Sequence, residues 1–131
     1  MVERSADWYK QAKRDLELAK KVATDEFWEW ACYAAHQSAE KALKAILQKR
    51  GYDAWGHSLL KLCQELESTD PSTKELIEDA KKLDKLYIPT RYPNGFVSGA
   101  PMDYYTQDDA KQAIASSLKI LYWVEERLNL N

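Results

Sequence analysis

The chain has 131 residues, of which 19 are basic and 21 acidic, and a formal net charge of −2. This length fits one domain over residues 1–131 with a substantial core, and the balanced charge excludes a polybasic nucleic-acid or membrane binder. No apolar run approaches the roughly 20 residues of a membrane span, and we find no signal peptide. The two cysteines fit no metal-binding or disulfide pattern. We therefore expect a cytoplasmic protein with no metal or cofactor.

Two long helices are predicted at the N-terminal end. The first begins at Ser5, its expected cap, and continues to about Ala23. The second extends from about Phe27 to Arg50, where Gly51 ends it. At 1.5 Å per residue the second helix would be about 36 Å long, which makes it the spine of a small bundle.

The second predicted helix has three different faces when it is turned by about 100° per residue. One face is apolar and contains Trp28, Cys32, Ala35, Ala39, Leu43 and Ile46. Another holds only small side chains, which are Ala31, Ala34, Ser38, Ala42 and Ala45. The third is polar, with Tyr33, His36, Gln37, Glu40, Lys41 and Lys44. Such a helix packs on two sides and presents a polar edge between them.

Two shorter helices follow a connector over residues 51–56. The third is expected to begin at His57 and Ser58. Asp70 followed by Pro71 predicts the start of a fourth, because aspartate caps a helix and proline suits its first position. This helix should end near Tyr87, because Pro89 disfavours a helical conformation at the residue before it.

Residues 88–105 form an unusual segment with three prolines, two glycines and four aromatic residues. A loop of this length in a compact domain is often functional, and its aromatic residues can hold it in place. Thr106 and Asp109 then open a fifth helix. The predicted fold is therefore all-α, an up-and-down four- or five-helix bundle with a long Pro/aromatic loop before the last helix.

The polar edge of the second helix is the first candidate site. His36, Glu40 and Lys44 are spaced i, i+4 and i+8, so their side chains share one edge. Glu40 would orient His36 there, while Lys44 and Gln37 would meet an anionic or polar ligand. The alternative interpretation is an ordinary ion-paired helix edge, with His36 satisfied beside the core.

Two further candidates lie outside that helix. Arg91 stands among prolines and aromatic residues between Tyr87 and Pro93, and a guanidinium held beside Tyr92 suits a phosphate or a stacked base. The alternative for Arg91 is that it caps a helix end or pairs with an acid. Gly56, His57 and Ser58 could bind an anion through backbone N–H groups or serve only as a local cap.

Three segments together resemble the HEPN domain family. They are Ala35-His36-Gln37-Ser38-Ala39-Glu40-Lys41-Ala42-Leu43-Lys44-Ala45, then Gly56-His57-Ser58-Leu59, then Tyr87-Ile88-Pro89-Thr90-Arg91-Tyr92-Pro93. The resemblance covers nearly the whole chain. It implies a prokaryotic helical bundle that is commonly a homodimer, is similar to the helical domain of kanamycin-type nucleotidyltransferases, and is paired with a small nucleotidyltransferase protein. It also implies nucleotide binding.

The sequence departs from the HEPN ribonucleases and toxins in one respect. Their signature is an arginine followed by four to six residues and then a histidine near the start of a late helix. Here Arg91 is followed by Tyr92-Pro93-Asn94-Gly95-Phe96-Val97-Ser98, without a histidine. Arg50 precedes His57 with six residues between them, but this pair lies between the second and third helices, so we treat the match as chance.

Three hypotheses follow. The first is a non-catalytic module that binds a nucleotide, or an RNA phosphate, and works with a separately encoded nucleotidyltransferase in a toxin–antitoxin-like pair. The second is a metal-independent ribonuclease or toxin that uses Arg91 with His36 or His57. The third is a structural dimerisation module whose small-residue face, including Ala34, meets a second copy. In the first hypothesis the ligand site combines two groups of residues that face each other. One group is Gln37, Glu40, Lys41 and Lys44, and the other is Arg91 and Tyr92. Further contributors are His36, His57 and Tyr87.

Overall fold

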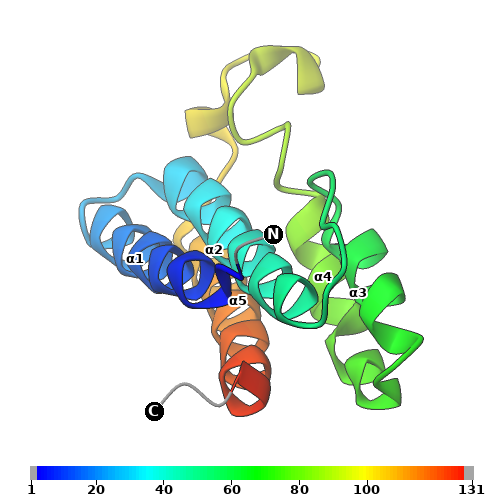
Figure 1. The fold of residues 1–131 in the computed structure, drawn as a ribbon. Helices are drawn as coiled ribbons and strands as arrows, with labels where there is room; N and C mark the ends of the chain where they lie inside the picture. The colour runs from blue at the N-terminus through cyan, green and yellow to red at the C-terminus, as the bar shows by residue number, and fades with distance from the viewer. Residues whose placement is uncertain (1–2, 129–131) are drawn as a thin grey trace.

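The computed structural model describes residues 3–128, and this part of the chain contains five α-helices, three short 3-10 helices and no strand. Figure 1 shows α2 (Trp28–Lys49) at the centre of the bundle. It packs against α1 (Ser5–Thr24) and α5 (Gln107–Leu128) and touches the smaller pair α3 (Leu59–Glu67) and α4 (Ile77–Asp84). The predicted all-α fold is confirmed. No helix within residues 3–128 has both the length and the apolar composition that crossing a membrane requires.

The central helix is buried on two sides. Its small-residue face packs on α1, where the Ser38 hydroxyl donates to the Ala12 carbonyl oxygen at 2.6 Å. Ala34 and Ala42 on this face are 6% and 0% exposed. Small side chains let the two helix backbones approach closely. The hypothesis that this face meets a second copy is therefore wrong, because the face is occupied by α1 of the same chain.

Local capping explains where several elements begin. The Ser58 hydroxyl accepts from the Lys61 backbone N–H at 3.2 Å, so the predicted start of α3 is correct. At the start of α5, the Thr106 hydroxyl accepts from the Asp109 N–H while the Asp109 carboxylate accepts from the Thr106 N–H. Ser5 is different, because it lies inside α1 and is buried rather than acting as a cap.

The fourth predicted helix differs from the structure at both ends. Asp70 caps the N–H of Ser72 as expected, but the chain first forms the 3-10 helix η1 (Pro71–Leu76). The α-helix α4 ends at Asp84 rather than near Tyr87. Beyond it the N–H of Tyr87 bonds the carbonyl of Asp84, three residues back, so the last α-turn tightens before Pro89.

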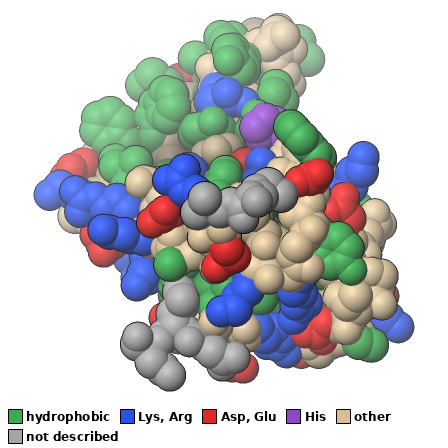
Figure 2. Space-filling model, in the orientation of Figure 1, with side chains coloured by type: hydrophobic (Ala, Val, Ile, Leu, Met, Phe, Trp, Pro, Cys, Tyr) green, Lys and Arg blue, Asp and Glu red, His purple; other side chains and the backbone are tan. Residues whose placement is uncertain are grey.

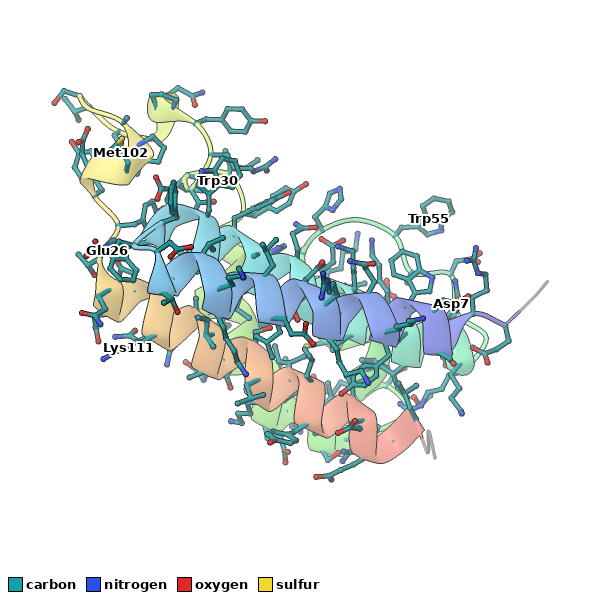
Figure 3. All side chains as sticks on the ribbon, turned by 90° about the vertical axis from the view of Figure 1, so that its left-hand side faces the viewer. Asp7, Glu26, Trp30, Trp55, Met102 and Lys111 are labelled. Atoms are coloured by element: carbon teal, nitrogen blue, oxygen red, sulfur yellow. The ribbon has the colours of Figure 1, made fainter. Side chains whose placement is uncertain are left out.

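Residues 88–105, called the arm from here on, project beyond the helices at one end of the molecule (Figures 1 and 3). The arm includes the short 3-10 helices η2 (Pro93–Gly95) and η3 (Pro101–Asp103). Its own aromatic side chains order it: the rings of Phe96 and Tyr104 stack with centroids 4.3 Å apart, and the Tyr104 hydroxyl donates to the Ser98 carbonyl. The arm is thus a folded projection that joins α4 to α5.

Candidate functional site

The side chain of Arg91 is held at the base of the arm by aromatic rings. Its Cζ atom lies 4.4 Å, 4.6 Å and 5.1 Å from the ring centroids of Tyr33, Tyr87 and Tyr92. Its Nε–H donates to the Tyr87 carbonyl at 3.0 Å, which caps the end of the α4 turn. Within residues 3–128 no carboxylate lies at ion-pair distance from this guanidinium. Arg91 is therefore fixed in direction while its charge is left without an anionic partner.

The ring of Tyr87 also contacts both histidines. The imidazole of His57 stacks on it with a centroid distance of 4.9 Å and an interplanar angle of 18°. The imidazole of His36 lies 5.0 Å away at 41°. The two differ in access, because the side chain of His57 is 55% exposed and that of His36 is fully buried. Of the two histidines, His57 is therefore the one that a ligand can reach.

A buried carboxylate fixes His57. The Glu40 Oε1 atom lies 2.9 Å from Nδ1 of His57, and its Oε2 atom accepts from the Lys44 ammonium at 3.2 Å. The side chain of Glu40 is only 6% exposed. We expected Glu40 to orient His36, its neighbour four residues earlier. That expectation is wrong, because the histidine that bonds Glu40 comes from the connector before α3.

Asp84 holds His36 and was not among the predicted residues. Its carboxylate lies 3.3 Å from Nε2 of His36 and accepts from the backbone N–H groups of Leu59 and Leu60 at 2.8 Å and 3.0 Å. Burial raises the pKa of Asp84, but these hydrogen bonds outweigh it, so the pKa lies below its usual value. The N-terminus of α3, considered above for an external anion, is thus occupied by Asp84.

The remaining predicted residues of α2 fall into two groups. Gln37 reaches His36, with its Nε2 atom 3.4 Å from Nδ1, and the ammonium of Lys44 lies beside Glu40 with 11% of its side chain exposed. Lys41 instead forms an ion pair with Asp15 of α1. The structure therefore brings one cluster together and leaves Lys41 outside it. We call this the tyrosine–arginine cluster, and it comprises Tyr33, His36, Gln37, Glu40, Lys44, His57, Asp84, Tyr87, Arg91 and Tyr92.

Tyr33 was also missed as a site residue, although it lies on the polar face of α2 one turn before Gln37. Burial raises the pKa of Tyr33 even though Arg91 lies nearby, so the phenol stays protonated. Tyr33 and Gln37 also line a groove of about 440 Å³ between α1 and α2. Leu18 and Val22 of α1 form its other wall, next to Trp30. The groove and the cluster thus share one side of α2.

The near-match to the ribonuclease signature does not form a site. Arg50 pairs with Asp70 at 3.4 Å, whereas His57 lies in the tyrosine–arginine cluster. The hydroxyl and N–H of Ser72, together with Arg127, hold the pKa of Asp70 at about 2. Arg50 therefore belongs to a separate ion-pair network. In the described part of the chain, no three His, Cys, Asp or Glu side chains converge in a way that would hold a metal ion.

The geometry of the cluster defines its chemistry. A guanidinium without a carboxylate and an exposed imidazole both contact the ring of Tyr87, so two hydrogen-bond donors that suit an anion lie around one ring. Tyr92, 48% exposed, offers a ring face to a planar group. The Glu40 carboxylate fixes Nδ1 of the His57 imidazole and leaves its Nε2 atom to contact a ligand.

Comparison with known proteins places this chain in a family. A crystal structure of a Thermus thermophilus protein is 42% identical with a TM-score of 0.92, covering 96% of this chain and 99% of that one. An archaeal HEPN homologue is 39% identical with a TM-score of 0.82, at 98% and 100% coverage. A Methanocaldococcus jannaschii protein named as a candidate toxin is 25% identical over 128 residues, 91% of this chain and 84% of that one. The family model described as HEPN domain matches residues 5–127, and the chain therefore belongs to the HEPN domain family.

Proposed function

We propose that this HEPN protein binds the phosphate of a nucleotide at Arg91 and His57. In this proposal it is a non-catalytic module that works with a separately encoded small nucleotidyltransferase as one half of a toxin–antitoxin pair. The candidate toxin of Methanocaldococcus jannaschii, a relative over most of the chain, supports a place in such a pair.

The proposal depends on the surroundings of the Arg91 guanidinium. The other four arginines in residues 3–128 each pair with a carboxylate, and Arg127 lies 2.9 Å from Asp70. Arg91 instead packs among three tyrosine rings that lower its conformational freedom and supply no negative charge. Its one side-chain hydrogen bond in residues 3–128 uses Nε, which leaves the two Nη groups for a ligand.

Each neighbour has a role in the proposed complex. Nε2 of His57 contacts a second phosphate oxygen, because Glu40 already holds Nδ1. The rings of Tyr87 and Tyr92 wall the site and can stack on a base. Lys44 holds the Glu40 carboxylate that fixes His57, and Gln37 offers its amide to a polar group at the edge. Lys41 has no part in this site, since Asp15 neutralises it.

Isothermal titration with ATP, GTP and the other nucleotides tests this proposal. We expect saturable binding that Arg91→Ala weakens by roughly ten- to a hundredfold, because a hydrogen bond to a charged group contributes about 1.5–3 kcal/mol. Arg91→Lys keeps the charge but loses the planar fork, so its affinity should lie between those of wild type and Arg91→Ala.

Arg14→Ala is the matched control. It removes the same charge from an exposed site on α1, where Arg14 pairs with Glu17. Equal losses in Arg14→Ala and Arg91→Ala would show that only overall charge matters. Binding that is absent in wild type, or unaffected by Arg91→Ala, contradicts the proposal.

The Glu40–His57 pair favours RNA cleavage as a second candidate function. A histidine with Nδ1 fixed by a carboxylate can take a proton from an RNA 2′-hydroxyl through Nε2. The 2′-oxygen would then attack phosphorus to give a 2′,3′-cyclic phosphate, the bond to the 5′-oxygen would break, and that oxygen would take a proton from water as it leaves. Arg91 would stabilise the charge on the phosphorus centre. His36 is excluded from direct contact with RNA in this conformation, because it is fully buried.

Incubation of RNA with purified protein and a chelator distinguishes the two candidates. Cleavage that is lost in both His57→Ala and Arg91→Ala supports the ribonuclease. Equal cleavage by wild type and both variants would identify a contaminant. Nucleotide binding without cleavage supports the non-catalytic module.

A further inference from the structure

We infer that the groove between α1 and α2 is a base pocket, in which the guanine of a nucleotide binds while its α-phosphate contacts Arg91. This inference rests on the proposed function, because it names the base that accompanies the phosphate. Figure 2 shows apolar side chains gathered over the arm and the neighbouring end of α2, and charged side chains along α1. The groove, about 440 Å³ in volume, combines both kinds of side chain.

The groove continues the proposed phosphate site along α2. Tyr33, whose ring holds Arg91, lines the groove, and so does Gln37. Lys41 lines it eight residues beyond Tyr33, which is about 12 Å along the helix axis at 1.5 Å per residue. That separation is close to the length of a mononucleotide from its phosphate to the far edge of its base. A phosphate bound at Arg91 therefore allows the base to lie in the groove.

The walls of the groove suit a flat aromatic ring. Leu18 and Val22 belong to α1, and Trp30 and Ala34 belong to α2. Leu18 is 51% exposed and Trp30 is 48% exposed, so both offer apolar surface that the chain itself does not cover. Small-molecule sites are typically pockets of about 300–1,000 Å³ with mainly apolar walls and a few polar groups. A base in the groove would remove this apolar surface from water.

The Asp15–Lys41 ion pair lies at the end of the groove away from the arm. The Asp15 carboxylate accepts from the Lys41 ammonium at one oxygen and from the Gln11 amide, 3.0 Å away, at the other. A carboxylate has about four acceptor positions, so about two remain for a ligand. The side chains of Asp15 and Lys41 are 13% and 26% exposed, so the pair is partly shielded from water. Lys41 thus serves the base pocket, although it has no part in the phosphate site.

Guanine fits this ion pair better than other bases do. Its N1–H and its 2-amino group lie side by side and can both donate to the Asp15 carboxylate, while its 6-carbonyl oxygen can accept from the Lys41 ammonium. Adenine offers the carboxylate only its 6-amino group, and hypoxanthine offers only its N1–H. The pocket therefore favours guanine over both by one hydrogen bond to a charged group.

Isothermal titration of the wild-type protein with GTP, ITP and ATP tests the base pocket, because ITP carries hypoxanthine in place of guanine. We expect GTP to bind roughly ten- to a hundredfold more tightly than ITP or ATP, since the other two lack one hydrogen bond to a charged group. ITP and ATP should still bind through their phosphates. Equal affinities for all three nucleotides overturn the inference.

Arg91→Ala separates this result from the fate of the phosphate site. It should weaken all three nucleotides by the same factor, because the phosphate is common to them. If the three bind equally and Arg91→Ala weakens each, the base pocket is wrong and the phosphate site stands. If none of them binds the wild-type protein, both are wrong.

Asp15→Asn tests the residue that reads the base. Its amide N–H would face the 2-amino group of guanine, but it can donate to the 2-carbonyl oxygen of xanthine. We therefore expect the ratio of XTP affinity to GTP affinity to rise at least about tenfold over wild type. The ratio compares two ligands on the same protein, so a loss of stability does not change it.

Asp7→Asn is the matched control for Asp15→Asn. It removes the same charge from α1, at an exposed residue that pairs with Arg4, and it should keep the wild-type ratio. A wild-type ratio in Asp15→Asn, or the same rise in Asp7→Asn, overturns the inference.

Discussion

Replacing Asp84 with asparagine should destabilise the fold and disturb the candidate site together. The carboxylate accepts from Leu59 N–H, Leu60 N–H and the Ser58 hydroxyl, and it contacts His36, so it ties α4 to the start of α3 and to α2. An asparagine oxygen can keep the two contacts of one carboxylate oxygen, either those with Leu59 N–H and His36 or those with Leu60 N–H and the Ser58 hydroxyl. Its amide group would point a donor at another donor, and the negative charge at the helix N-terminus would be lost.

The expected loss can be worked from these contacts. A hydrogen bond to a charged group contributes about 1.5–3 kcal/mol, and a carboxylate at a helix N-terminus adds up to about 2 kcal/mol when it is partly buried. With the contacts of one oxygen retained and those of the other lost, we expect Asp84→Asn to lower the free energy of unfolding by about 3 kcal/mol. For 131 residues this corresponds to a fall in Tm of about 10 °C, using an unfolding entropy of about 2.1 cal/mol/K per residue.

Thermal and urea unfolding followed by circular dichroism measure this loss. Asp108→Asn is the control, because Asp108 also lies in the first turn of a helix but is exposed and bonds only to the side chain of Gln112. Its cost should stay below about 0.5 kcal/mol. If Asp84→Asn costs no more than Asp108→Asn, the reasoning that Asp84 organises α3 and the cluster is refuted.

The effect of Asp84 should also depend on pH in a defined direction. Its pKa is lowered in the folded state, so its contribution is present above the usual carboxyl pKa of 3.8 and is lost as the pH falls below that value. The stability difference between wild type and Asp84→Asn should therefore be full near neutral pH and shrink in acid. A difference that grows as the pH falls would contradict this linkage.

Three further changes test other parts of the structure. Asp70→Asn should remove about 1 kcal/mol at neutral pH, because the pKa of Asp70 falls from 3.8 to about 2 on folding and solvent screens part of this effect. The contribution is present above pH 3.8 and lost toward pH 2, and an unchanged acid-unfolding curve would count against it. Ala42→Leu should cost about 1–3 kcal/mol by overfilling the contact with α1, and a variant as stable as wild type would show that this contact is loose. Glu40→Gln should cost about 2 kcal/mol in urea unfolding by weakening the bonds to Lys44 and His57, and a neutral result would contradict the buried position of this carboxylate.

Much of the helical framework could be predicted from local signals. Gly51 ends the central helix, Ser58 caps α3, and Thr106 with Asp109 caps α5, because each acts within a few residues of its own position. The boundaries of the fourth helix were harder to predict. Asp70 and its proline mark a start correctly, but a 3-10 turn and an α-turn have the same capping chemistry, so the sequence could not distinguish them.

The candidate site was less predictable, because its contacts join distant segments. A spacing of four residues placed Glu40 beside His36, yet His57, 17 residues away in the chain, takes the bond. Asp84 and the start of α3 are also separated by about 25 residues, and nothing in the local sequence marks Asp84 apart from other acids. Which partner each carboxylate binds depends on how the helices pack against one another, and the periodicity of a single helix carries no information about this packing.

For Arg91, the structure combines the two interpretations: its side chain caps a carbonyl group and is also held among aromatic rings.

The side-chain N–H signal of Arg91 gives the most direct test of the proposed phosphate site. In two-dimensional NMR of the wild-type protein, addition of ATP should shift the Nη–H resonances of Arg91 and the imidazole resonances of His57 saturably and with one dissociation constant, because the Nε–H of Arg91 already donates to Tyr87 and the Nη groups are left for the ligand. The Nη–H resonances of Arg127 should stay in place, because its Nη groups already donate to Ser72 and to the Trp123 carbonyl. An Arg91 signal that does not move at saturating nucleotide, or one that moves no more than that of Arg127, would contradict the account.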